Sequence, residues 1–298
     1  MRNIALVGVG NISNKYLSGL SKSSFNLVCL VDINTSPIGI KYYKDYPLYK
    51  TIKEATSHHK LDYVLISTPP NTHDVLIKEA LDQNINVLVE KLISTNINTY
   101  QALIDLARRK GLVLETLYHW QFGDEVPLVK SLITKSIKEI VIHGEDPYCD
   151  MNGHVKSSYL NLGGALIDSL PNVLSFLSLI ININQLEFKG RTDIKDSVSK
   201  QIVQTNLTYN VGDTIIKIHI NWLSHKNHKE TTILFDDDTS IYINHSIPLV
   251  KTESLTINLS NENRLETHYL NLFGSYESRK HHELHMHLIH KFLIDQIT

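Results

Sequence analysis

The first 120 residues alternate between short apolar runs and helical segments, and this alternation constrains the fold more than any other feature of the chain. The apolar runs cover residues 4–7, 27–31, 63–67, 87–89 and 112–117. Between them, residues 13–20, 72–82 and 98–110 have helical patterns, and Gly111 follows the last of these as a C-terminal cap. Continuous apolar strands separated by helices are typical of a parallel sheet that is covered on both faces.

Beyond residue 120 the pattern changes to long strands in which apolar and polar residues alternate. Residues 216–222 read Ile-Lys-Ile-His-Ile-Asn-Trp, as expected for an antiparallel strand with one buried face. We expect further strands at 139–143 and between 186 and 272, and helices at 128–134, 169–181 and 278–297. The chain is therefore predicted to be an α/β protein, in which a parallel-sheet domain (residues 1–120) precedes an α+β domain (residues 121–298) with an open, mainly antiparallel sheet.

Composition excludes several classes of protein. The chain carries 29 Lys and Arg against 31 Asp and Glu, a formal net charge of −2, so it has no excess positive charge for nucleic acid phosphates. No apolar run reaches the roughly 18 residues of a membrane helix, and the run at 4–7 is too short for a signal peptide. The two cysteines form no paired framework, which fits a reducing compartment. We therefore expect a cytoplasmic protein that binds neither nucleic acid nor membranes.

The first strand is followed by the sequence Gly-Val-Gly-Asn-Ile-Ser at residues 8–13. In a dinucleotide-binding (Rossmann) turn, the first glycine permits a sharp bend and the second lets the backbone approach a pyrophosphate. Ser13 stands at the third glycine position, where a small residue allows close packing. Asp32 ends the next strand at about the spacing of a carboxylate that binds the adenosine ribose. Because Ile33 and Asn34 offer no cation for a 2′-phosphate, we predict NAD rather than NADP as the cofactor.

Two further motifs follow predicted parallel strands, where ligands of open α/β sheets bind. They are Thr-Pro-Pro-Asn-Thr-His at residues 68–73 and Glu-Lys at residues 90–91. Together with the Gly-x-Gly turn, these motifs resemble the Gfo/Idh/MocA oxidoreductases. Leu92 stands where that family has proline, a replacement that can remove a fixed, often cis, peptide bond. The resemblance implies an active-site lysine, Lys91, and cofactor contacts from Gly8, Gly10, Asn11, Ile12, Asp32, Thr68, Pro69, Asn71, His73, Glu90 and Lys91.

Residues 163–172 read Gly-Gly-Ala-Leu-Ile-Asp-Ser-Leu-Pro-Asn. This segment is similar to Gly-Gly-x-x-x-Asp-x-Gly-x-His in the same family, with Asp168 in place and Asn172 where the histidine is usual. Asparagine at that position resembles the aldose 1-dehydrogenase branch, which includes D-galactose and L-arabinose 1-dehydrogenases. From local geometry alone, Asp168 is also a candidate helix N-cap, with Asn172 on the same side of the helix. The branch resemblance adds the substrate-binding candidates His119, Trp120, Glu145 and His154.

The resemblance implies an NAD(P)-dependent aldose 1-dehydrogenase that oxidises the anomeric carbon of a monosaccharide to a lactone. We interpret Asp168 as the base or proton relay, Lys91 as the cation that orients the hydroxyl, and Asn172 as a hydrogen-bonding positioner. Two other classes stay open. One is a reductase of the same family for an imine, a keto sugar or a tetrapyrrole, and the other is a non-catalytic NAD-binding regulator.

Two expectations concern the second half of the chain. His281 and His285 have the i, i+4 spacing of zinc ligands, but no carboxylate–histidine motif accompanies them, so we predict no metal site. The resemblance implies that their helix, 278–297, packs on the first domain. The apolar side of the strand at 216–222 needs cover, and a domain helix covers only one face of a sheet. We therefore predict a homodimer that forms through the outer sheet face.

Overall fold

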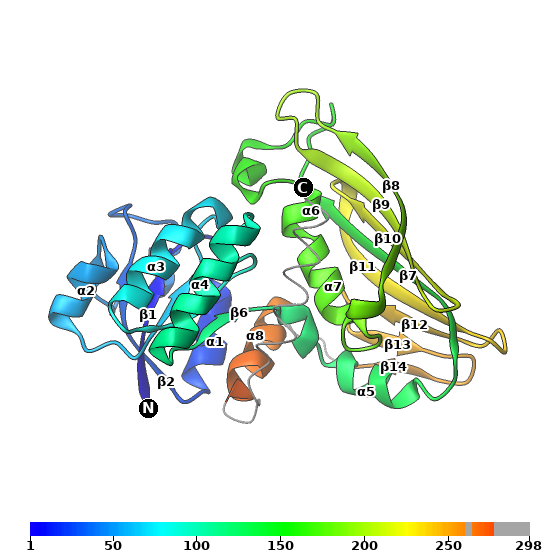
Figure 1. The fold of residues 1–298 in the computed structure, drawn as a ribbon, viewed down its shortest axis with the longest axis horizontal. Coiled ribbons are helices and arrows are strands. Elements are labelled where there is room, and N and C mark those ends of the chain that lie inside the picture. Colours follow the sequence, from blue (N-terminus) through cyan, green and yellow to red (C-terminus); the bar gives the residue numbers. More distant parts are fainter. Residues whose placement is uncertain (260–263, 277–298) are drawn as a thin grey trace. The chain divides into compact units, whose positions relative to one another are not determined.

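The computed structural model describes residues 1–259 and 264–276, and its internal contacts divide the chain into two units (Figure 1). The first unit comprises residues 1–118 and continues from residue 269, and the second comprises residues 119–268. The chain therefore passes between the units at 118/119 and again at 268/269. The expected helix at 278–297, with its histidines, lies outside the described residues.

The first unit is built on a six-stranded parallel sheet with the order β3-β2-β1-β4-β5-β6. This confirms the predicted parallel sheet, and the short strand β3 is an addition at its edge. Parallel strands end at the same edge, so the residues that follow β1, β2, β4 and β5 all lie there. The strands are β1 (Arg2–Val7), β2 (Phe25–Val31), β3 (Leu48–Tyr49), β4 (Tyr63–Ile66), β5 (Asn86–Val89) and β6 (Leu114–Thr116).

Helices connect these strands, and two of them, α2 and α4, begin at a side-chain cap. The Thr51 hydroxyl accepts a hydrogen bond from the Glu54 amide at the start of α2, and Asn96 caps α4 in the same way. Gly111 ends α4 in the left-handed conformation, with φ 64°, which confirms the predicted cap. The helical segments are η1 (Ser13–Lys15), α1 (Tyr16–Ser21), η2 (Ile40–Tyr42), α2 (Ile52–His58), η3 (Pro70–Thr72), α3 (His73–Asp82) and α4 (Ile97–Lys110).

The helix α8 (Arg264–Gly274) corrects the prediction that strands continue to residue 272. Tyr269, Leu272 and Phe273 are buried, and their i, i+3, i+4 spacing is helical. From residue 269 onward α8 belongs to the first unit, where Tyr269 and Phe273 pack edge-on against Tyr16 of α1. The second part of α8 therefore contributes to the same unit as the glycine-rich turn.

The second unit contains an eight-stranded sheet with the order β14-β13-β12-β11-β7-β10-β9-β8. Strands β7 and β10 pair in parallel and the other neighbours are antiparallel, which confirms the predicted mainly antiparallel sheet. The strands are β7 (Ile137–Pro147), β8 (Glu187–Lys195), β9 (Ile202–Val211), β10 (Thr214–Asn221), β11 (Leu223–Phe235), β12 (Ser240–Asn244), β13 (Leu249–Lys251) and β14 (Thr256–Asn258).

The helices of this unit pack on one face of its sheet, α6 against β9 and β10, and α5 against β12 and β13 (Figure 1). The helix expected at 169–181 is found as the shorter α7, and a further short helix, α6, comes directly before it, so that the two meet at Ser169. Asp168 ends α6 and therefore is not the N-cap of the following helix, because Ser169 has that position. The helical segments are η4 (His119–Phe122), α5 (Glu125–Leu132), η5 (Ser157–Leu162), α6 (Ala165–Asp168), α7 (Leu170–Leu177) and η6 (Ile183–Gln185).

The two faces of the second sheet differ in chemistry. Ile216, Ile218 and Ile220 are completely buried on the helix-covered face. The cover that the apolar side of this strand was expected to need is therefore supplied within the unit. The opposite face is polar, with a stacked pair, His143 and His219, whose ring centroids lie 4.7 Å apart. Among the described residues, the structure contains no helix with the length and apolar character needed to cross a membrane.

Candidate functional site

The glycine-rich turn after β1 requires glycine at its first position. Gly8 has φ +89°, and a Cβ there would lie 2.7 Å from the Thr68 side chain and 2.8 Å from the Thr68 amide nitrogen. Gly10 is different, since a Cβ at that residue would meet no atom within 4 Å. The first glycine therefore lets β1 and the turn after β4 pack closely, and the second borders open space.

The turn presents backbone donors toward that space. The amides of Gly10, Asn11 and Ile12 make no hydrogen bond to a described residue. Behind them, the buried Ser13 hydroxyl donates to the Gly10 carbonyl at 2.8 Å, and Tyr43 donates to the Ser13 carbonyl. A braced loop with consecutive free amides is the arrangement that binds a pyrophosphate.

Asp32, directly after β2, is tied to the same turn. Its Oδ2 accepts a hydrogen bond from the Val9 amide at 2.8 Å, and its Oδ1 accepts one from the Asn34 amide at 2.9 Å. Each carboxylate oxygen keeps a lone pair for a further donor, such as a ribose hydroxyl. Ile33 beside it is 88% exposed, and no basic residue occupies positions 33–36.

The segment after β4 contributes Thr68, Pro69 and Asn71, of which Pro69 and Asn71 are exposed. His73 instead has a fully buried ring. Its Nδ1 lies 2.5 Å from the Leu92 carbonyl oxygen and its Nε2 lies 2.9 Å from that of Thr68. His73 therefore connects the turn after β4 to the loop after β5. Its ring is enclosed by these two segments and is not exposed at the edge of the sheet.

Glu90 and Lys91 follow β5. The buried Glu90 carboxylate accepts hydrogen bonds from the hydroxyls of Tyr16, at 3.0 Å, and Tyr269, at 2.5 Å. Burial raises the pKa of Glu90, although these hydrogen bonds and the Lys91 charge oppose the rise. The peptide between Lys91 and Leu92 is cis, so replacement of the family proline has not removed that geometry.

In the second unit, Asp168 lies beside a buried ion pair that the sequence did not reveal. The Lys229 ammonium is 2.5 Å from the Asp146 carboxylate, and Lys229 donates a further hydrogen bond to the Glu145 carbonyl at 2.7 Å. Ser169 donates to Asp146 at 3.5 Å and accepts from the indole of Trp222 at 3.1 Å. This network fixes the junction of α6 and α7, where Asp168 is located.

Asn172 lies in the first turn of α7 and is 8% exposed. Its Oδ1 is buried and has no hydrogen-bond partner in the part of the chain that the structure describes. A buried amide oxygen without a partner costs free energy, and such groups commonly bind water or a ligand. The Oδ1 atom of Asn172 can therefore accept a hydrogen bond from a ligand.

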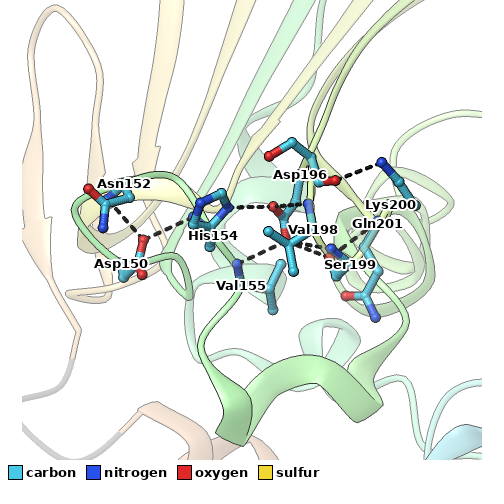
Figure 2. Close-up of polar contacts among 10 residues, drawn as sticks. Asp150, Asn152, His154, Val155, Asp196, Val198, Ser199, Lys200 and Gln201 are labelled. Atoms are coloured by element: carbon cyan, nitrogen blue, oxygen red, sulfur yellow. Dashed lines mark hydrogen bonds and ion pairs between the residues drawn. The ribbon is translucent and has the colours of Figure 1, made fainter.

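His154 has an oriented imidazole (Figure 2). Its Nδ1 lies 2.8 Å from Asp196, a buried carboxylate that also accepts hydrogen bonds from the Val198 amide and the Ser199 amide and hydroxyl. Burial opposes ionisation of Asp196, but these hydrogen bonds hold its pKa well below the usual range. A carboxylate at Nδ1 favours the tautomer in which Nε2 is an acceptor. The other predicted substrate contact in this region, Glu145, is already engaged, because its carboxylate accepts a hydrogen bond from the Ser224 hydroxyl.

His119 and Trp120 occupy a buried cluster of the second unit. The His119 ring nitrogen Nδ1 lies 3.0 Å from Nδ1 of His268, and Trp120 stacks on His245, which in turn binds Glu125 at 2.7 Å. Both predicted substrate contacts are thus side chains with little exposure. Their partners come from distant segments, so no local pattern could have identified them.

Comparisons with known proteins agree with this fold. Residues 2–118 match the model of the oxidoreductase family GFO_IDH_MocA, described as an NAD-binding Rossmann fold. The uncharacterized oxidoreductase YdgJ of Escherichia coli (strain K12) is 22% identical over 164 residues, which is 54% of this chain and 47% of that protein. The match therefore spans about half the length of that relative.

Two solved structures have a similar fold over nearly the whole chain. KijD10, a 3-ketoreductase from Actinomadura kijaniata in complex with NADP and TDP-benzene, has a TM-score of 0.83 at 15% identity, covering 99% of this chain and 96% of that one. GenD2 from gentamicin A biosynthesis, in complex with NAD, has a TM-score of 0.81 at 14% identity, covering 98% and 92%. The first unit of the chain is therefore similar, over residues 2–118, to the NAD-binding Rossmann domain of the Gfo/Idh/MocA oxidoreductases.

Proposed function

We propose that this protein is an NAD-dependent aldose 1-dehydrogenase, which oxidises the anomeric carbon of a monosaccharide to a lactone. The observation that carries the proposal is Asn172. Its buried, unpartnered Oδ1 can accept a hydrogen bond from a sugar hydroxyl, and it lies four residues from Asp168. A neutral amide beside a carboxylate suits a substrate rich in hydroxyl groups, each of which is both donor and acceptor.

The turn after β1 would hold the dinucleotide. The amides of Gly10, Asn11 and Ile12 would bind the pyrophosphate, and Asp32 would bind the hydroxyls of the adenosine ribose. When bound, NAD supplies the acceptor for the hydride from the sugar. We propose NAD over NADP because a 2′-phosphate would lie near the Asp32 carboxylate with no cation at residues 33–36. Further contacts would come from Thr68, Pro69, Asn71 and Lys91, with His73 and Glu90 holding the loops that carry them.

Three side chains would carry the chemistry. The Asp168 carboxylate would accept the proton of the anomeric hydroxyl, while the Lys91 ammonium would orient this hydroxyl and stabilise the developing negative charge. Asn172 cannot titrate, so it would position the sugar without moving a proton. His154, held by Asp196, would contribute a substrate hydrogen bond through Nε2. The other proposed substrate contacts are His119, Trp120 and Glu145.

A second candidate function is oxidation or reduction at another carbon of a nucleotide sugar. It is favoured by two structural relatives, KijD10, named as a 3-ketoreductase, and GnnA from Acidithiobacillus ferrooxidans, named as a UDP-N-acetylglucosamine 3-dehydrogenase. The same three side chains could act there, since a secondary alcohol also loses a hydride and a proton. Free aldoses and nucleotide sugars therefore both belong in the assays.

Variants at the proposed catalytic residues test the assignment. Because general acid–base catalysis contributes typically 10²–10⁴-fold, Asp168→Asn and Lys91→Met should each lower kcat by about that factor. NAD affinity, measured by calorimetry, should change little for Asp168→Asn, because that residue lies outside the Rossmann unit. Asn172→Ala should raise KM more than it lowers kcat. An Asp168→Asn variant with near wild-type turnover would show that the proton leaves by another route.

We also propose a cytoplasmic location and a homodimer through the polar outer face of the second sheet. Free, buried Cys29 and Cys149 are compatible with a reducing compartment. The outer face carries ion pairs and stacked rings, such as Lys217 with Glu139 at 2.5 Å, that a second copy could cover.

A further inference from the structure

Tyr148 follows β7 directly, and two aromatic neighbours hold its ring. The ring stacks on Tyr159 with centroids 4.2 Å apart and an interplanar angle of 23°, and it meets Trp222 edge-on at 5.0 Å. Its backbone carbonyl accepts a hydrogen bond from the Lys156 amide at 3.0 Å. A ring that is held on its face and at its edge keeps its hydroxyl group in one place.

The aromatic contacts connect Tyr148 to the junction of α6 and α7. The indole of Trp222 donates to the Ser169 hydroxyl at 3.1 Å, and Ser169 is the residue after Asp168. Tyr148 also interacts electrostatically with Asp146 and with Asp168. Burial and then these two carboxylates raise the pKa of Tyr148 well above its usual range. The phenol therefore stays protonated and is a hydrogen-bond donor at neutral pH.

The hydroxyl of Tyr148 makes no hydrogen bond within the described part of the chain. Neither Asp146 nor any other described residue makes a hydrogen bond with it, and Asp146 already binds Lys229, Asn227 and Ser169. The side chain is half-buried, so a ligand can still reach it. A fixed donor thus stands near the carboxylate of Asp168, whose oxygens are acceptors.

We propose that the Tyr148 hydroxyl donates a hydrogen bond to a hydroxyl oxygen of the sugar that binds at Asp168, which makes Tyr148 a further substrate-binding and specificity-determining residue. This inference rests on the proposed function, since it takes a hydroxylated sugar as the ligand. A donor in the neighbourhood of an acceptor matches a sugar hydroxyl, which accepts one hydrogen bond and donates another. Asn172 adds a second acceptor through its Oδ1, and Tyr148 adds a donor whose ring is held in place by its neighbours.

The test is Tyr148→Phe, which keeps the ring and its stacking and removes only the hydroxyl. The matched control is Tyr159→Phe, which removes the hydroxyl of the stacking partner. A neutral hydrogen bond contributes about 0.5–1.5 kcal/mol, so Tyr148→Phe should weaken sugar affinity by roughly twofold to tenfold. Tyr159→Phe should bind as wild type does, and all three proteins should have the same NAD affinity and melting temperature.

Deoxy sugars identify the hydroxyl that Tyr148 binds. Calorimetry on the NADH-loaded protein, which cannot oxidise the sugar, would compare D-galactose with its 1-, 2-, 3- and 4-deoxy analogues for wild type and Tyr148→Phe. The wild type should lose affinity for one analogue, and the variant should bind that analogue as well as wild type does, because the same hydrogen bond is then absent from both. Equal affinities of wild type and variant for D-galactose, or an equal loss for every analogue, would overturn the role of Tyr148.

The ligand panel separates this inference from the proposed function. If UDP-N-acetylglucosamine binds and free aldoses do not, the aldose assignment fails, and the affinity of Tyr148→Phe for the nucleotide sugar still tests the hydrogen bond. If D-galactose binds equally to both proteins, only the role of Tyr148 fails. A wild-type protein that binds none of these sugars contradicts both.

Discussion

Replacing Lys229 by methionine should destabilise the second unit strongly. The ammonium group of Lys229 lies 2.5 Å from Asp146, and the two side chains are only 7% and 5% exposed. Methionine keeps the length of the side chain but removes the ammonium group that lies against a buried carboxylate. Ser169 and Asn227 also donate hydrogen bonds to Asp146 and keep doing so in the variant.

The size of the effect follows from burial. Removing one partner of a buried ion pair costs about 3–5 kcal/mol, whereas removing one partner of an exposed pair costs at most about 1 kcal/mol. At roughly 2–4 °C per kcal/mol for a unit of this size, Lys229→Met should lower Tm by about 6–20 °C. Lys217→Met is the matched control, because Lys217 pairs with Glu139 on the outer face of the same sheet with 44% and 25% exposure.

Tryptophan fluorescence is a selective assay, because Trp120 and Trp222 both belong to the second unit. Urea unfolding followed by tryptophan fluorescence should show the full loss of unfolding free energy for Lys229→Met. The unfolding free energy of Lys217→Met should change little. Adding Asp146→Leu to Lys229→Met should recover much of the loss, since both charges of the pair are then removed together. A Lys229→Met variant within 1 kcal/mol of wild type would refute the argument that Asp146 depends on this ammonium.

Three further predictions concern the cofactor, acid stability and assembly. Asp32→Ala should weaken NAD binding and lower the NAD/NADP preference, and an unchanged ratio of Kd values would contradict the ribose assignment. Burial alone would raise the pKa of Glu125, but the hydrogen bond and charge of His245 outweigh it and lower the pKa below the usual 4.5. The resulting stability is present above pH 4.5 and is lost as pH falls through the lowered pKa, so Glu125→Gln should flatten that acid loss in tryptophan-detected unfolding. Light scattering at micromolar concentration should give the mass of a dimer, and a mass of 34.0 kDa would contradict the proposed interface.

The first unit was predictable from sequence because its determinants are local. Gly8 must be glycine at φ +89°, and Asp32 follows the next strand at a spacing that the Rossmann turn imposes. The alternation of apolar strands and helices likewise depends on neighbours in the chain. His73 was recognised within its motif, but its bond to the Leu92 carbonyl required the folded arrangement of two loops.

The second unit was less predictable because its polar contacts join distant residues. Asp146 and Lys229 are 83 positions apart, and nothing near either residue in the sequence marks the pair. Tyr148 lies beside Trp222 only because β7 and β10 pair in parallel. The contact between Ser169, at the junction of α6 and α7, and the indole of Trp222 likewise joins residues 53 positions apart.

The most direct test of the proposed function is NAD reduction with free sugars. Purified protein with NAD would be offered D-galactose, L-arabinose and UDP-N-acetylglucosamine, with absorbance reporting NADH and nuclear magnetic resonance identifying the product. The proposal predicts NADH formation with an aldose, a lactone as the first product, and loss of the reaction in Asp168→Asn. NADH formation with the nucleotide sugar alone, or a keto sugar in place of the lactone, would contradict it.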